Sequence, residues 1–288
     1  MTDEADEKIF DKVYEEESPD FSKHINIAVV GKVSSGKSSL INAILGYKRG
    51  DKDSFQVGST SGVTTKLKIK KLGDNVLIVD CPGLNDIKKK NTEVTTDFLK
   101  NIDIGLFVVT DSADAKQKAD YDDLKDNTKR VIVVLNKIDV WDGLEESAYE
   151  EVKQQWKQVL GATKIYGTCT KGYDPKTRQD APMRLEGIDE VRGEMLTFLK
   201  TEGKDILLAR HLKDKSQYAN RIIAGALVAV AAEAFIPGSA VYITATQALT
   251  IGTLHYLYKG QPLSKASALG LIGIFAGQSI GMNTFLWV

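Results

Sequence analysis

The chain has 288 residues, a formal net charge of −1 and 42% hydrophobic residues. This length predicts one or two domains with a substantial core, and the near-zero charge gives no direct nucleic-acid signal. The two cysteines, without a CxxC motif or a Cys/His cluster, exclude a disulfide framework and argue against zinc. The acidic start, MTDEADEKIF, is neither a secretory signal nor a transit peptide, which favours a reducing, cytoplasmic location.

The first segment, residues 1–24, is acidic: it carries nine Asp or Glu against three Lys, a net charge of −6. Ile9, Phe10, Val13 and Tyr14 recur at helical spacing and predict a short amphipathic helix. Two alternatives stay open for this N-terminal segment, an exposed acidic arm and a helix docked on another part of the chain.

Residues 25–203 alternate apolar runs with polar stretches of helical length. The runs are INIAVV, KLKIKKL, NVLIVD, IGLFVVT, RVIVVLN and TKIYGT. Several are continuous Val, Ile and Leu, which is typical of strands buried on both faces, whereas KLKIKKL alternates as an edge strand would. The pattern predicts an α/β fold with a mostly parallel six-stranded sheet and helices on both faces. Residues 170–186 contain two prolines and are expected to form a loop before a last helix near 187–200.

The stretch GKVSSGKS fits the pattern GxxxxGK[ST] and lies between a predicted strand and a predicted helix. Its glycines let backbone N–H groups converge on phosphate oxygens at a helix N-terminus. Lys37 would reach the β- and γ-phosphates, and Ser38 would ligate Mg²⁺. The expected nucleotide-contacting set in this loop is Gly31, Ser34, Ser35, Gly36, Lys37, Ser38 and Ser39.

Two further motifs follow predicted strands. In VDCPG, Asp80 could hold Mg²⁺ through a water, and the N–H of Gly83 could bond the γ-phosphate. In VVLNKID, Asp139 could accept two hydrogen bonds from N1–H and the amine of guanine, a pattern that adenine does not offer. Lys137 would lie over the base, and Asn136 would tie this loop to the phosphate loop. Three motifs in this order, each at a strand end, predict a guanine nucleotide.

These motifs resemble the translation-factor-like GTPases of the Era, Der and TrmE group over about residues 25–200, with a dynamin-like feature in the phosphate loop. The resemblance implies a Ras-like fold, GTP hydrolysis with Mg²⁺, and two switch segments, 50–65 and Cys81 to about Thr92. In the first, GVTT resembles the effector motif. It implies that Thr64, rather than its neighbour Thr65, is a Mg²⁺ ligand.

The resemblance also assigns site roles. GTCTKG resembles the base-adjacent loop, with Cys169 and Thr170 where the family usually has Ser-Ala. The implied catalytic set is Lys37, Thr64 and Gly83, and the implied metal ligands are Ser38, Thr64 and Asp80. Arg49 is the nearest candidate for an arginine finger, although a solvated surface residue is the simpler account of it.

Leu84 stands where Ras-type enzymes have the glutamine that orients the attacking water. Because an apolar side chain cannot orient a water, we expect slow hydrolysis that self-association, such as a nucleotide-dependent homodimer, or a partner accelerates. Some relatives instead use potassium and carry Asn at the fourth phosphate-loop position. Here Ser34 occupies that position, which puts K⁺ activation in doubt.

The tail, residues 204–288, is apolar with seven Lys or Arg against three acids, a net charge of +4. Pro237-Gly238 and Gly260-Gln261-Pro262 divide it into three helical pieces. Residues 238–258 and 266–288 reach about the 20 residues of a bilayer span, and the basic run 209–221 could meet anionic lipid. A packed helical appendage, membrane-embedded helices and an oligomerisation surface are the alternatives, with membrane association favoured.

Part of the tail, FIPGSAVYITATQALTIGTLHYLYKG, resembles a helical domain found behind Era-like GTPases, whose members are often membrane-associated. The order of short helix, GTPase domain and helical tail also resembles the immunity-related GTPases. We therefore expect an all-α C-terminal domain that reports nucleotide state to a membrane or partner. A dynamin-like membrane-remodelling machine and a non-hydrolysing GTP-binding scaffold are the alternative functions.

Overall fold

A computed structural model describes residues 2–48, 51–56, 68–88, 93–143, 146–171 and 184–274. The chain divides into two compact units, Ser22–Lys213 and a smaller unit that combines Met1–Phe21 with Asp214–Val288. This division differs from the expected boundaries at residues 24 and 203. It groups the acidic N-terminal segment with the C-terminal helices and assigns residues 204–213 to the larger unit.

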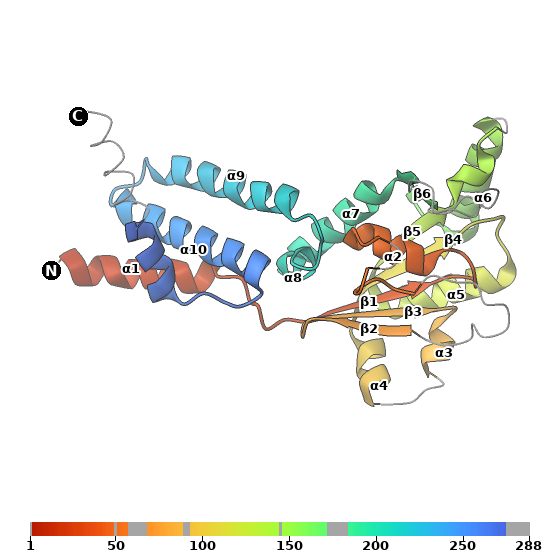
Figure 1. Ribbon diagram of the computed structural model, residues 1–288, viewed down its shortest axis with the longest axis horizontal. Helices are drawn as coiled ribbons and strands as arrows, with labels where there is room; N and C mark the ends of the chain where they lie inside the picture. The colour runs from red at the N-terminus through yellow and green to blue at the C-terminus, as the bar shows by residue number, and fades with distance from the viewer. Residues whose placement is uncertain are drawn as a thin grey trace. The chain divides into compact units, whose positions relative to one another are not determined.

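The larger unit is built on a seven-stranded sheet with the order β2-β3-β1-β4-β5-β6-β7 (Figure 1). Its strands are β1 (Ile25–Val30), β2 (Lys68–Leu72), β3 (Val76–Cys81), β4 (Ile102–Val109), β5 (Thr128–Asn136), β6 (Ile165–Lys171) and β7 (Arg184–Glu186). The five inner strands are parallel, and the edge strands β2 and β7 pair antiparallel with their neighbours. The α/β class and the edge position of KLKIKKL are confirmed.

The sheet has one strand more than the six expected, because β7 forms at the end of the segment 170–186. Its three residues pair with the last three residues of β6 in the register Cys169↔Glu186 to Lys171↔Arg184. Arg184 and Leu185 are exposed and Glu186 is half-buried, so β7 carries no apolar run that the sequence could reveal. Residues 172–183 lie outside the described part of the chain.

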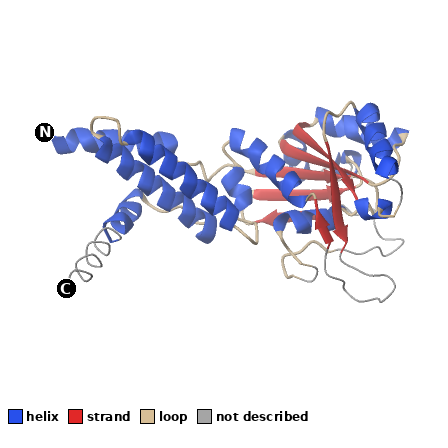
Figure 2. Cartoon of the chain, turned by 90° about the horizontal axis from the view of Figure 1, so that it is seen from above, coloured by secondary structure: helices blue, strands red, loops and turns tan. Residues whose placement is uncertain are grey.

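Helices cover both faces of this sheet (Figure 2). They are α2 (Lys37–Leu45), α3 (Leu84–Lys88), α4 (Glu93–Lys100), α5 (Ala115–Asp126), α6 (Glu146–Leu160), α7 (Ile188–Thr201) and α8 (Asp205–Ala209), with a short 3₁₀ helix η1 (Ile138–Trp141). One face packs on α3–α6 through side chains such as Ile87, Phe98 and Trp156. The other face, with Ile27 and Leu106, packs on α2, α7 and α8. This double covering explains why all eight residues of β4 are buried.

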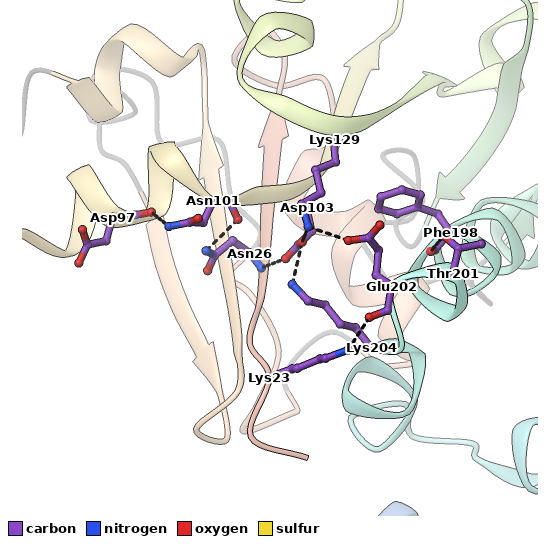
Figure 3. A network of polar contacts seen from close by, with 10 residues as sticks. All are labelled: Lys23, Asn26, Asp97, Asn101, Asp103, Lys129, Phe198, Thr201, Glu202 and Lys204. Carbon is purple, nitrogen blue, oxygen red and sulfur yellow. Dashed lines mark hydrogen bonds and ion pairs between the residues drawn. The ribbon is translucent and has the colours of Figure 1, made fainter. Parts of the chain in front are cut away.

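A polar network lies at the amino end of the parallel strands (Figure 3). Asp103, which is 1% exposed, accepts hydrogen bonds from the backbone N–H of Asn26 at 3.1 Å and from Lys204 at 2.8 Å. Lys129 lies 3.2 Å from the same carboxylate and 2.7 Å from Glu202. The network therefore fastens the turn between α7 and α8 to β1, β4 and β5.

The smaller unit consists of α1 (Thr2–Glu17), α9 (Ser216–Glu233), α10 (Ser239–Lys259) and a further helical segment at 265–274. Phe10 is 7% exposed and packs with Ala245, Ala248 and Ala268. Of the two alternatives for the N-terminal segment, the structure therefore shows the docked helix.

Left-handed glycines bound α10 on both sides, Gly238 and Gly260 each with φ 75°, so the predicted helix breaks are confirmed. Within the described residues, no helix combines the length and apolar content needed to cross a membrane. The residues 238–258 thus have the length of a span without its hydrophobicity, which the threonines of α10 lower.

Candidate nucleotide-binding site

The predicted motifs follow strands whose carboxyl ends meet at one edge of the sheet. The phosphate loop follows β1, Asp80 lies near the end of β3, Asn136 ends β5 and Thr170 lies near the end of β6. The carboxyl ends of parallel strands are where sheets of this kind bind ligands. The structure therefore brings the described phosphate, metal and base candidates together.

The phosphate loop runs from Gly31 to the start of α2 at Lys37. Ser34 and Gly36 are left-handed, with φ 66° and 88°, a conformation that turns successive N–H groups toward one point. A Cβ at Gly36 would lie 2.4 Å from the Asn136 side-chain amide, and one at Gly31 would lie 2.1 Å from the Val108 carbonyl oxygen. The loop thus has the shape of an anion cradle that only glycine permits at these two positions. Ser39 follows in the first turn of α2.

The Ser35 hydroxyl is a buried polar group without a partner. The residue is 2% exposed, and its Oγ forms no hydrogen bond with any described residue. Leaving a buried hydroxyl unpaired costs free energy unless a ligand completes it. Its position in the loop fits a ligand with acceptor oxygens, such as a phosphate.

Lys37 lies within this loop rather than in solvent. Its Nζ donates to the carbonyl oxygens of Gly31 at 2.8 Å and Lys32 at 3.0 Å and lies 3.8 Å from Asp80. Burial lowers the pKa of Lys37, and the Asp80 carboxylate opposes this only in part. A buried cation held mainly by carbonyl oxygens is poorly compensated, so an anionic phosphate would be a better partner.

Ser38 and Asp80 provide a donor pair that suits Mg²⁺. The Ser38 hydroxyl donates to the Asp80 carboxylate at 2.6 Å, and both side chains are part-buried or buried. Hydroxyl and carboxylate oxygens are the hard ligands that Mg²⁺ takes beside phosphate oxygens. The residues present therefore fit the ion. The third predicted ligand, Thr64, lies outside the described residues, as does its neighbour Thr65.

Asn136 connects the base end of the site to the phosphate end. It is fully buried, and its amide donates to the Ser35 carbonyl oxygen at 2.9 Å while its Oδ1 accepts from Thr168 at 3.0 Å. The expected tie between the two loops is confirmed by this contact. Lys137, which follows, is left-handed with φ 63°. Such strained backbone is concentrated at functional sites.

Asp139 lies at the start of η1 and faces β6. Its carboxylate is 3.5 Å from the Cys169 Sγ and 3.4 Å from the Lys171 ammonium. Burial raises the pKa of the Cys169 thiol, which keeps it protonated and able to donate weakly to the carboxylate. The stretch GTCTKG was expected to form a loop, but its residues up to Lys171 belong to β6, because Cys169 to Lys171 pair with β7. Cys169 and Lys171 therefore contact Asp139 from the end of a strand, with Thr170 between them.

Neither Lys68 nor Lys171 was among the residues predicted from the sequence. The position of Leu84 agrees with the expectation that this side chain does not orient the attacking water. Leu84 is 1% exposed and packs in the sheet core, so its side chain is turned away from any attacking water. The alternation in KLKIKKL predicts an edge strand with one solvent-exposed face, so nothing in the sequence marked Lys68 as a residue of the site. Arg49 and residues 57–67 of the first switch lie outside the described part of the chain.

Residues 26–137 match the family model described as 50S ribosome-binding GTPase. GTPase Era of Caldanaerobacter subterraneus is 28% identical, covering 61% of this chain and 66% of the relative. GTPase Der of Wolinella succinogenes is 32% identical over 54% of this chain and 35% of the relative. The tRNA modification GTPase MnmE of Carboxydothermus hydrogenoformans is 33% identical over 41% of this chain and 26% of the relative.

Proposed function

Residues 26–137 form a P-loop GTPase domain of the Era, Der and MnmE group, and from this premise we propose that the protein is a GTP-binding and GTP-hydrolysing switch. The chain spans 66% of the Era relative and 35% of the Der relative, and the proposal concerns this chain alone. The hydrogen bond from Asn136 to the Ser35 carbonyl carries the proposal, because it joins the base-reading loop to the phosphate loop.

The base end supports guanine over adenine. Asp139 presents a carboxylate that can accept from both N1–H and the exocyclic amine of guanine, and adenine offers no such pair. Lys137 would cover the base with its aliphatic stem. Cys169 and Thr170 would line the other side. Lys171 must move from Asp139 by enough to admit the base, since its ammonium lies 3.4 Å from the carboxylate.

The phosphate end supports a nucleoside diphosphate or triphosphate. The N–H groups from Gly31 to Ser39, the Ser35 hydroxyl and Lys37 would bind the phosphate oxygens. Ser38, Asp80 and Thr64 would hold Mg²⁺, which would supply positive charge to the phosphate oxygens. With Gly83 and Thr64 bonded to the γ-phosphate, both switch segments would be ordered, and loss of that phosphate would release them.

We expect intrinsic hydrolysis to be slow. Leu84 is buried in the core, so the water must be oriented by a backbone group, another side chain, a bound K⁺ or a partner copy. An arginine finger contributes roughly 10³–10⁵ in rate, and the candidate for one, Arg49, lies outside the described residues. Turnover measured against protein concentration, in potassium and in sodium, would separate self-association from ion activation.

Equilibrium binding of fluorescent GDP and ADP to the purified chain tests the proposal directly. A site built to hydrogen-bond one base rejects another by about 10³-fold or more, so GDP should be preferred by at least that factor. Equal affinity for the two nucleotides, or binding of neither, would contradict a guanine-nucleotide switch.

A second candidate role, contact with an anionic membrane surface, is favoured by exposed apolar side chains along α9 and just beyond its C-terminal end. They are Ile223, Leu227, Val228, Phe235 and Ile236, with Leu227 66%, Val228 72% and Phe235 90% exposed. Arg221 on the same helix would supply positive charge to anionic headgroups. This apolar α9 face gives the helical unit a surface through which it could report nucleotide state.

Sedimentation with vesicles tests this second role. Vesicles that contain phosphatidylserine should retain the wild-type chain, and the double variant Leu227→Ser, Val228→Ser should be released. Ile69→Ser, which removes an exposed apolar side chain from the sheet-bearing unit, serves as the control. Retention of the double variant at the wild-type level would rule out the α9 face as the lipid contact.

A further inference from the structure

Lys68 is a cation beside the two groups that fit Mg²⁺. Its Nζ lies 3.4 Å from the Ser38 Oγ and donates to the Gln56 carbonyl oxygen at 2.9 Å. The same Ser38 hydroxyl donates to the Asp80 carboxylate at 2.6 Å. The ammonium therefore lies at the metal end of the candidate site, although Lys68 belongs to no GTPase motif.

The sheet fixes this position. Lys68 is the first residue of β2 and pairs across the antiparallel ladder with Asp80 of β3. Directly opposed residues on antiparallel strands project their side chains from the same face of the sheet. Lys68 and Asp80 thus share one face by strand register, and the Gln56 carbonyl holds the ammonium on that side.

The charges at this end are unbalanced. Lys37 lies 3.8 Å from the Asp80 carboxylate, and Lys68 approaches the same Ser38–Asp80 pair from the opposite strand. One carboxylate faces two ammonium groups, which leaves one positive charge for an anionic ligand to neutralise.

We infer that Lys68 is a tethered cation that binds the nucleotide phosphates when Mg²⁺ is absent and that gives way when the ion binds. This inference rests on the proposed guanine-nucleotide function and adds a phosphate-binding residue to that site. It also predicts an unusually small dependence of GDP affinity on Mg²⁺, because a second cation beside Ser38 and Asp80 is repelled by Lys68.

Equilibrium binding of fluorescent GDP, in excess EDTA and in millimolar Mg²⁺, tests the inference through affinity alone. Lys68→Gln keeps much of the side-chain length and removes the charge. Lys71→Gln is the matched control, because it removes the same charge from the same strand, from an exposed position on the other face. We expect Lys68→Gln to bind GDP about tenfold more weakly than wild type in EDTA, whereas Lys71→Gln stays within about twofold.

The two conditions together separate the outcomes. With Mg²⁺, Lys68→Gln should match wild type within about twofold, which also shows that the variant folds. Equal GDP affinities for Lys68→Gln and Lys71→Gln in EDTA would overturn the inference, as would an equal loss with and without Mg²⁺. Failure of the wild-type chain to bind GDP in Mg²⁺ would overturn the proposed function itself, and the Lys68 inference with it.

Discussion

The two ends of the parallel strands in the larger unit differ in how their buried charged side chains are paired. At the amino end, Asp103 is 1% exposed and meets three donors, two of them lysines (Figure 3). At the carboxyl end, Lys37 is 8% exposed and is held by two carbonyl oxygens, with its nearest carboxylate 3.8 Å away. The buried charge at the amino end is paired within the chain, whereas the buried charge at the carboxyl end has no close carboxylate, which fits the phosphate ligand that we propose.

The backbone differs in the same sense. The carboxyl end contains the two left-handed residues other than glycine in the described part of the chain, Ser34 and Lys137, and the unpaired hydroxyl of Ser35. Strain and unsatisfied polar groups lower stability, so a fold keeps them where they serve binding. The comparison therefore predicts that substitutions at the amino end lower stability, whereas substitutions at the carboxyl end lower nucleotide affinity.

The largest effect should follow from Asp103→Ala. Removing this carboxylate leaves Lys204 and the Asn26 N–H without their acceptor, and breaking a buried ion pair costs about 3–5 kcal/mol in the free energy of unfolding. Urea denaturation would measure this loss. The GDP affinity of the folded protein should stay within about twofold, because the two sites share no partners.

Asp122→Ala is the control for Asp103→Ala. Asp122 is 49% exposed and pairs with Lys118 one helical turn away. Exposed pairs of this kind contribute below about 1 kcal/mol, so the control should denature close to wild type. Similar losses for the two variants would show that the amino-end network has no special role in stability.

Asp139→Asn should have the next largest effect, this time on affinity. An amide oxygen accepts more weakly than a carboxylate, and the amide NH₂ opposes the guanine amine. Loss of two charge-assisted hydrogen bonds should weaken GDP binding about 10²- to 10³-fold. Xanthosine diphosphate, which has a carbonyl in place of the amine, should bind this variant better than GDP. Calorimetry with both nucleotides would check the exchange, and unchanged GDP affinity would remove Asp139 from the base site.

The variant Leu84→Gln tests whether a glutamine at this position, as in Ras-type enzymes, raises GTP turnover. Because Leu84 packs in the core against the sheet, an amide there would be buried without a partner and should cost about 2–3 kcal/mol in stability. We expect no gain in GTP turnover. A rate increase in single-turnover assays would mean that the glutamine reaches the site and that the hydrophobic residue alone limits catalysis.

Much of the larger unit could be predicted because its signals are local. Continuous Val, Ile and Leu runs identified the buried strands, and the alternation in KLKIKKL identified β2 as an edge. The tie from Asn136 to the phosphate loop followed from motif order. The short strand β7 could not be predicted, since its three residues form a strand only by pairing with β6.

The missed features depend on contacts between distant segments. The position of Lys68 beside Ser38 requires the register of β2 against β3, which alternation alone does not specify. No role was predicted for Asp103 from the sequence. Its three donors lie near the ends of other elements, so their convergence on this carboxylate could not be predicted. In the smaller unit, helix-period residues predicted an apolar face on α1, but only packing showed that Phe10 is buried while Ile9 stays 37% exposed.

Ser35→Ala should give the smallest and most discriminating effect. Its hydroxyl is buried and forms no hydrogen bond with a described residue, so its removal should leave the free energy of unfolding unchanged or raise it by up to about 1 kcal/mol. GDP affinity should nevertheless fall, by about three- to tenfold, if the hydroxyl donates to a phosphate oxygen. Thermal unfolding with and without GDP would measure both terms on one sample. A loss of stability without nucleotide would show that the Ser35 hydroxyl has a partner within the protein. The carboxyl end of the strands would then not differ from the amino end in its unpaired polar groups.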